Sequence, residues 1–180
     1  MLFRSHSAEI MARSGFDWLF LDLQHGLMDR TALVDMIRAI DTMRLPSMVR
    51  IPWNRPEAAG WALDAGAAGV IAPMVNTADQ AASLVAACRY APHGIRSWGP
   101  ARPALTQSDY QPAAANAEIV VCPMIETQEA VDNLGAILAV AGIGVILIGQ
   151  SDLAMAFGLH PRDGRGDAGH RQRLADIAAT

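Results

Sequence analysis

Short apolar runs alternate along the chain with stretches in which apolar residues recur every three or four positions. The runs are typical of strands buried on both faces, and the periodic stretches are typical of helices with one buried side. We expect five strands, centred near Asp17, Val49, Ile71, Val121 and Ile146. Because helical patterns separate these strands, the sequence predicts a parallel α/β fold.

Local signals place several element boundaries. Gly15 is expected to end a first helix over Ser7–Ser14, since glycine readily takes the backbone conformation that closes a helix. Thr77 followed by Gln80 has the spacing of a capping box and predicts the start of another helix. The segment 91–116 is rich in Pro, Gly and Ala. It predicts a long loop with one helical turn, and such loops are usually functional in compact domains.

The stretch from Ile119 to Asp152 contains two apolar runs that each lead to a carboxylate, Glu126 and Asp152, with a helical pattern between them. A strand-helix-strand crossover brings both strand ends to the same edge of a parallel sheet. Ligands bind at that edge in parallel α/β folds. We therefore predict that Glu126 and Asp152 hold a divalent metal ion. The alternatives are an acid in the first turn of a helix for Glu126 and a helix N-cap for Asp152.

Polar residues also follow other predicted strands, so that Asp22, Arg50, Glu126 and Asp152 fall at four different strand ends. A barrel gathers such ends around one mouth, whereas an open sheet spreads them along an edge. This favours a (β/α)8 TIM barrel over a doubly wound sheet. The 180 residues form one partial barrel domain, 1–180, because a complete barrel of this type needs about 250 residues. Strands one, seven and eight are expected to be missing, in a truncated chain or one that another chain completes.

Composition limits the partners. Hydrophobic residues make up 52%, the net charge is -4, and no basic run is present, which favours a small ligand over nucleic acid or an anionic membrane surface. No apolar stretch has the length of a membrane span and no signal-peptide pattern is visible. Together with the isolated cysteines Cys88 and Cys122, this predicts a cytoplasmic location. The 180 residues contain no lysine, which excludes an aldolase that forms an imine through lysine.

Six blocks then resemble a known family: GFDWLFLDLQHG, VRIPWN, GAAGVIAPMVNTADQA, RYAPHGIRSWG, MIETQEAVDNL and GVILIGQSDLA. They occur, between about Ser5 and Gly158, in the order seen in the HpcH/HpaI aldolase/citrate lyase family, the metal-dependent class II pyruvate aldolases. The resemblance implies a TIM barrel of the phosphoenolpyruvate/pyruvate type. It also implies cleavage of 4-hydroxy-2-oxo acids to pyruvate and an aldehyde with Mg, Mn or Co, in trimers or hexamers.

The resemblance also implies residue roles. Glu126 and Asp152 match the two acidic metal ligands, and Arg50 matches the arginine that faces the carbonyl oxygen of pyruvate. His25 matches the histidine beside the metal-bound water, and Asp22 the acid that orients this histidine. The alternatives are structural roles: an ion pair for Arg50, and for His25 a hydrogen bond with the neighbouring aspartate that has no catalytic role.

Substrate contacts are implied as well. The backbone of Gly149, Gln150 and Ser151 lies where similar proteins bind the carboxylate of pyruvate. Two positions depart from many relatives: Met124 replaces a glutamine, and Gln24 replaces a glutamate before the histidine. Met124 is therefore expected to alter a substrate or water contact. Arg96 and Trp98 are expected to pin the long loop.

The residue types suit one reaction. Cleaving a carbon-carbon bond next to a ketone leaves an enolate, whose negative oxygen needs positive charge fixed in advance. A divalent cation held by two carboxylates, with Arg50 as a second donor, meets this need. The alternatives are an acyl-CoA carbon-carbon lyase of the citrate lyase branch and a truncated, non-catalytic barrel fragment.

Overall fold

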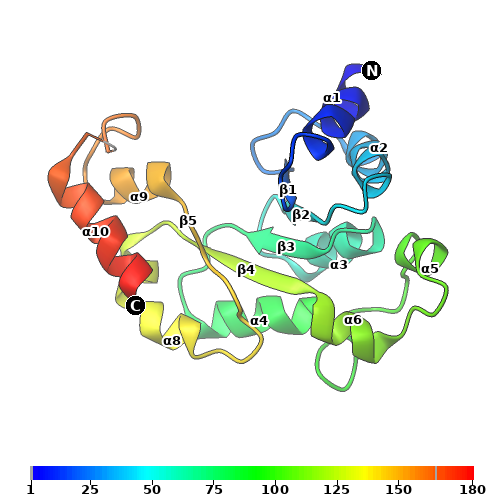
Figure 1. Ribbon diagram of the computed structural model, residues 1–180. Coiled ribbons are helices and arrows are strands. Elements are labelled where there is room, and N and C mark those ends of the chain that lie inside the picture. Colours follow the sequence, from blue (N-terminus) through cyan, green and yellow to red (C-terminus); the bar gives the residue numbers. More distant parts are fainter. Residues whose placement is uncertain (1, 165) are drawn as a thin grey trace.

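The computed structural model describes residues 2–164 and 166–180 and contains a parallel sheet with strand order β1-β2-β3-β4-β5. The strands are β1 (Leu19–Asp22), β2 (Ser47–Arg50), β3 (Gly69–Ala72), β4 (Val120–Ile125) and β5 (Leu147–Ile148). The predicted α/β class and number of strands are confirmed. The sheet curls without closing, so the fold is an incomplete barrel (Figure 1).

Helices connect successive strands and cover one face of the sheet (Figure 1). In chain order they are α1 (Leu2–Ala12), α2 (Arg30–Asp41), α3 (Pro56–Asp64), α4 (Ala78–Cys88), α5 (Pro103–Thr106), α6 (Pro112–Glu118), α7 (Gln128–Asp132), α8 (Leu134–Leu138), α9 (Gln150–Ala156) and α10 (Ala168–Ala179). The first helix begins earlier than predicted. The long loop contains two short helices instead of one turn, because Pro103 and Pro112 each start a helix.

Alternate residues of each strand enter different cores. Val49, Val70 and Val121 belong to the large core between the sheet and its helices. Met48 and Ile71, with Cys122, Met124 and Leu147, form a smaller cluster on the opposite face. Each fully buried aliphatic side chain contributes about 1.5–3 kcal/mol. The large core therefore holds the helices on one face of the sheet. The smaller cluster packs on the opposite face of the strands.

The predicted start of α4 is confirmed, but one of its capping hydrogen bonds differs from that of a capping box. The hydroxyl of Thr77 accepts the N–H of Gln80 at 3.2 Å. The side chain of Gln80 accepts the N–H of Asn76 at 2.7 Å, and not the N–H of Thr77 as in a capping box. Asn133 interrupts the single helix predicted after β4 and separates α7 from α8.

The sheet has two edges, because within the described ranges β1 pairs only with β2 and β5 only with β4. Phe16, Trp18 and Phe20, on or next to β1, are between 42% and 49% exposed. Unpaired edges beside exposed apolar side chains promote association. We expect the 180-residue chain to self-associate in sedimentation velocity at micromolar concentration. A monodisperse monomer with one cooperative calorimetric transition would contradict this.

Candidate functional site

The predicted site residues gather at the carboxyl-terminal ends of the strands. Asp22 and Arg50 are the last residues of β1 and β2 and lie opposite each other in the register. Glu126 directly follows β4, and Gly149 directly follows β5. Asp152 does not end a strand as predicted, because β5 stops at Ile148 and Asp152 lies in the first turn of α9.

Asp22 holds Arg50 through a two-point ion pair. The Nε of Arg50 donates to Oδ1 of Asp22 at 2.8 Å, and Nη2 donates to Oδ2 at 2.5 Å. Burial alone would raise the pKa of Asp22, but hydrogen bonds from Arg50 and from two backbone N–H groups lower it below its ordinary value. The hydrogen bond with Asp22 in turn raises the pKa of Arg50. Arg50 is therefore a permanent cation with a fixed orientation.

The structure gives Asp22 a different contact with His25 from the one the resemblance implies. Oδ1 of Asp22 accepts the backbone N–H of His25 at 3.2 Å and that of Gln24 at 2.9 Å. Among the described residues, no hydrogen bond to the exposed His25 ring is found. Gly26 allows this turn, since a Cβ there would lie 2.0 Å from the carbonyl oxygen of Asp22. Asp22 thus positions the loop that carries His25, and it positions Arg50 directly.

Glu126 is a buried carboxylate, with 2% of its surface exposed. Its Oε1 accepts the backbone N–H of Met74 at 2.7 Å. Burial raises the pKa of Glu126, and the charge of Asp152 raises it further, although the Met74 N–H, Arg50 and His25 act in the opposite direction. The negative charge of Glu126 is therefore only partly compensated by the protein.

Two contacts at this site had no signal in the sequence. Met74 donates its N–H to Glu126 from a left-handed backbone conformation, with φ of 56°. The guanidinium of Arg50 lies 5.3 Å from the ring centroid of Phe20, a cation-π contact. A residue type alone reveals neither a backbone donor nor a neighbour on the next strand.

The two departures from the family pattern lie beside Arg50 and Asp22. Met124 is 3% exposed, and its Sδ lies 4.0 Å from Nη1 of Arg50. A thioether is a weak acceptor, so this nitrogen keeps its capacity to donate to a ligand. The side-chain oxygen of Gln24 is buried without a hydrogen-bond partner among the described residues.

The predicted backbone contacts for a carboxylate are only partly available. The N–H of Gly149 donates to the carbonyl oxygen of Ile125 at 3.0 Å and is thus already used. Gln150 and Ser151 occupy the first turn of α9, where backbone N–H groups have no partner within the helix. These two N–H groups remain candidates for the contact.

The donor set fits a hard divalent cation. Glu126 and Asp152 offer carboxylate oxygens, and the charge of Glu126 is buried and incompletely compensated. Within the described residues no group of three or more His, Cys, Asp or Glu side chains is placed to hold a metal. Two carboxylates suffice for an ion such as Mg²⁺, which usually keeps several water ligands.

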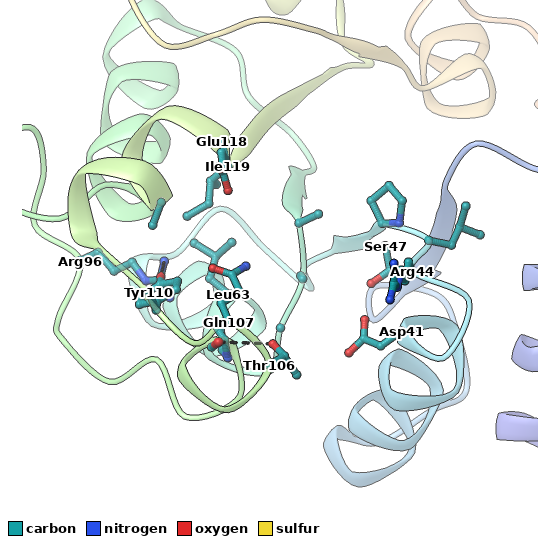
Figure 2. Close-up of a pocket in the computed structure, with 17 residues that line it drawn as sticks. Asp41, Arg44, Ser47, Leu63, Arg96, Thr106, Gln107, Tyr110, Glu118 and Ile119 are labelled. Carbon is teal, nitrogen blue, oxygen red and sulfur yellow. Dashed lines mark hydrogen bonds between the residues drawn. The ribbon is translucent and has the colours of Figure 1, made fainter.

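A hollow lies elsewhere, away from these residues. It has a volume of about 440 Å³ and is lined by residues at or just before the starts of β2, β3 and β4, including Ser47, Ala68 and Ile119 (Figure 2). Arg96 lines it and pairs with Asp64 at 2.7 Å, while the ring of Trp98 packs against those of Tyr90 and Tyr110 at tilted angles. None of the predicted site residues takes part, and these contacts agree with the expected pinning of the long loop.

The incomplete parallel barrel, with its polar groups collected at the carboxyl ends of the strands, places the chain among barrel proteins with a ligand site at that face. Residues 1–175 match the model of the HpcH/HpaI aldolase/citrate lyase family. The chain belongs to this family, as the sequence blocks indicated. No helix in the described parts of the chain is long and apolar enough to cross a membrane.

Known proteins support the assignment. A hydroxypyruvate/pyruvate aldolase of Rhizorhabdus wittichii is 42% identical over 154 residues, which are 86% of this chain and 61% of that protein. The chain thus spans about three fifths of the length of this relative. A HpcH/HpaI family protein from Burkholderia cenocepacia has a similar structure, with a TM-score of 0.81, 30% identity, and coverage of 97% of this chain and 70% of that one. A citrate synthase also has a TM-score of 0.81, at 29% identity over 96% of this chain and 68% of its own.

One prediction concerns Gly149, where a Cβ would lie 2.3 Å from Oε2 of Glu126. Gly149→Ala is expected to displace this carboxylate. If Glu126 holds a metal ion as predicted, kcat/KM should fall about 10–100-fold, the usual effect of disturbing the support of a metal ligand. Gly135→Ala is the control, because nothing lies within 4 Å of the added Cβ. Steady-state kinetics and metal titration would measure both variants, and equal behaviour would contradict the proposed close contact.

A second prediction follows from the raised pKa of Glu126, whose ordinary value is 4.5. Above about that pH the folded state binds more protons than the unfolded state, so stability falls as the pH rises through the folded pKa. Without metal, Glu126→Gln should therefore melt higher than the unchanged chain at pH 7–8, and the difference should vanish at acidic pH. Calorimetry across this pH range would test it, and a variant that is less stable at neutral pH would refute it.

Proposed function

We propose that the chain carries the metal-dependent site of a class II aldolase that cleaves 4-hydroxy-2-oxo acids to pyruvate and an aldehyde. The observation that carries the proposal is that a buried, incompletely compensated Glu126 and a rigidly held Arg50 lie at the same end of the sheet. The names of the aldolase relatives support the reaction class.

In this reaction the bond between C3 and C4 of the substrate breaks. The 4-hydroxyl loses its proton, and the electrons of its O–H bond form the C=O bond of the aldehyde. The electrons of the broken carbon-carbon bond move onto the ketone oxygen and give the pyruvate enolate. A divalent ion held by Glu126 and Asp152 would supply positive charge next to that oxygen when bound. Protonation of C3 then gives pyruvate.

Arg50 supplies the protein's own positive charge. Asp22 occupies Nε and Nη2 in the ion pair, and Nη1 has only the weak Met124 sulfur nearby. We assign Nη1 as the donor to the ketone oxygen. Its orientation is fixed before the substrate arrives, which spares the cost of reorganisation during the reaction.

His25 is our candidate for accepting the 4-hydroxyl proton. Its ring is exposed on the loop after β1. A neutral imidazole nitrogen can accept a proton and pass it on, which suits this role. The N–H groups of Gln150 and Ser151 are our candidates for the substrate carboxylate, by analogy with the family.

A second candidate function is that of an acyl-CoA lyase of the citrate lyase branch. The structural similarity to a citrate synthase is consistent with this alternative. The same enolate chemistry would serve both. Activity on CoA thioesters in place of 4-hydroxy-2-oxo acids would select this alternative. Homo-oligomers are proposed for the complete protein, as in the family.

Pyruvate release from 4-hydroxy-2-oxo acids tests the proposal. Activity should disappear with EDTA, return with Mn²⁺ or Mg²⁺, and fall about 10²–10³-fold in Arg50→Lys, the usual cost of losing one preorganised donor. Arg55→Lys, at the exposed start of α3, is the matched control. Cleavage that persists in EDTA would overturn the mechanism, and metal binding without cleavage would indicate a non-catalytic chain.

A further inference from the structure

The arginines that are largely buried follow a simple rule in this chain. Three of them pair with an aspartate through a hydrogen-bonded ion pair: Arg50 with Asp22, Arg96 with Asp64, and Arg102 with Asp41. Each pair neutralises a cation that burial would otherwise destabilise.

Arg89, at the end of α4, breaks this rule. It is 9% exposed, and no carboxylate among the described residues forms an ion pair with it. Its Nη2 donates to the carbonyl oxygen of Ile119 at 2.9 Å, and its Nη1 is buried without a hydrogen-bond partner in the described ranges. Burial lowers the pKa of Arg89, and the one further influence is the thiol of Cys88. Burial also raises the pKa of that thiol to about 12, so it is neutral at physiological pH.

Arg89 forms part of the wall of two adjoining hollows of about 470 and 520 Å³, which share Asn116, Ala117 and Gly142. The shared Asn116 and Ala117 belong to α6, and Val120 at the start of β4 lines the larger hollow. The hollows therefore lie near the amino-terminal end of β4, opposite the end that carries Glu126; Figure 1 shows α6 leading into this strand. Glu118 lines the larger hollow, whereas the smaller one contains no carboxylate and adds His93 as a possible donor.

We propose that the smaller hollow is a binding site for a compact oxyanion, a phosphate, sulfate or carboxylate group, which serves as the counter-ion of Arg89. The guanidinium has N–H groups in the fork geometry that such oxyanions match. The backbone next to it is held, because the Asn116 side chain accepts the N–H of Tyr90 at 2.7 Å and donates to its carbonyl oxygen at 3.1 Å. The site is independent of the proposed aldolase centre.

Thermal unfolding of the chain in increasing phosphate or sulfate, at constant ionic strength set with NaCl, tests the site. Above the Kd of the anion, the Tm should rise with the logarithm of its concentration, by about 3–5 °C for each tenfold increase. The measurement is repeated in Glu126→Gln, so that anions at the aldolase site cannot account for the effect. A Tm that depends on ionic strength alone, with chloride equal to phosphate, would overturn the proposal.

Ala117 permits a sharper variant, because it is exposed and lines the hollow together with Arg89. Ala117→Glu should supply the missing carboxylate, raise the Tm without phosphate, and abolish the phosphate-dependent rise. Ala114→Glu, exposed on the same helix and outside both hollows, is the control and should keep that rise. The helix dipole favours an acid at 114 over 117, so a larger gain at 117 has to come from Arg89.

The outcomes separate this site from the aldolase proposal. Pyruvate release should be the same in Ala117→Glu and Ala114→Glu, because the hollow lies at the far ends of the strands. A full phosphate-dependent rise in Ala117→Glu would refute the site even if the aldolase assay succeeds. Arg89→Gln should lose that rise, and Ala117→Glu keeps the test decisive if Arg89→Gln does not fold.

Discussion

The parallel register of the strands is the constraint on which the site depends. Hydrogen bonding between β1 and β2 aligns Asp22 with Arg50, so their side chains meet without help from a loop. The pairing of β4 with β5 then brings the chain after Ile148 to the carboxylate of Glu126. Side chains that are far apart in sequence thus become neighbours through backbone pairing alone.

The two ends of the sheet each carry a buried charged side chain, and the two charges have opposite signs. At the carboxyl ends, burial and a neighbouring acid disfavour the charge of Glu126. At the amino-terminal end of β4, burial disfavours the charge of Arg89. A folded chain tolerates such groups only when the rest of the core compensates for them. The large helix-covered core, which includes Leu33, Ile37 and Val49, provides that compensation.

Much of the fold and the grouping of the site were predictable from sequence. Strand-length apolar runs identified five parallel strands, and the positions of Arg50 and Glu126 after those runs placed them at one edge. The apolar run ends at Ile148, where β5 also ends, but the strand was predicted to continue to Asp152. The residues after Gly149 start α9 instead, and apolar periodicity does not reveal such a short helix. The partner of Asp22 was also hidden, since an aspartate at a strand end can contact an arginine of the next strand as readily as a histidine of its own loop.

The hydrogen bond from Met74 to Glu126 has an evolutionary consequence. It uses a backbone N–H, so any residue that accepts the left-handed conformation can provide it, and glycine or asparagine would do so with less strain than methionine. The bond itself does not depend on which side chain stands at position 74. Searches that compare side-chain motifs would overlook this position, and only comparison of backbone geometry among related proteins would recover it.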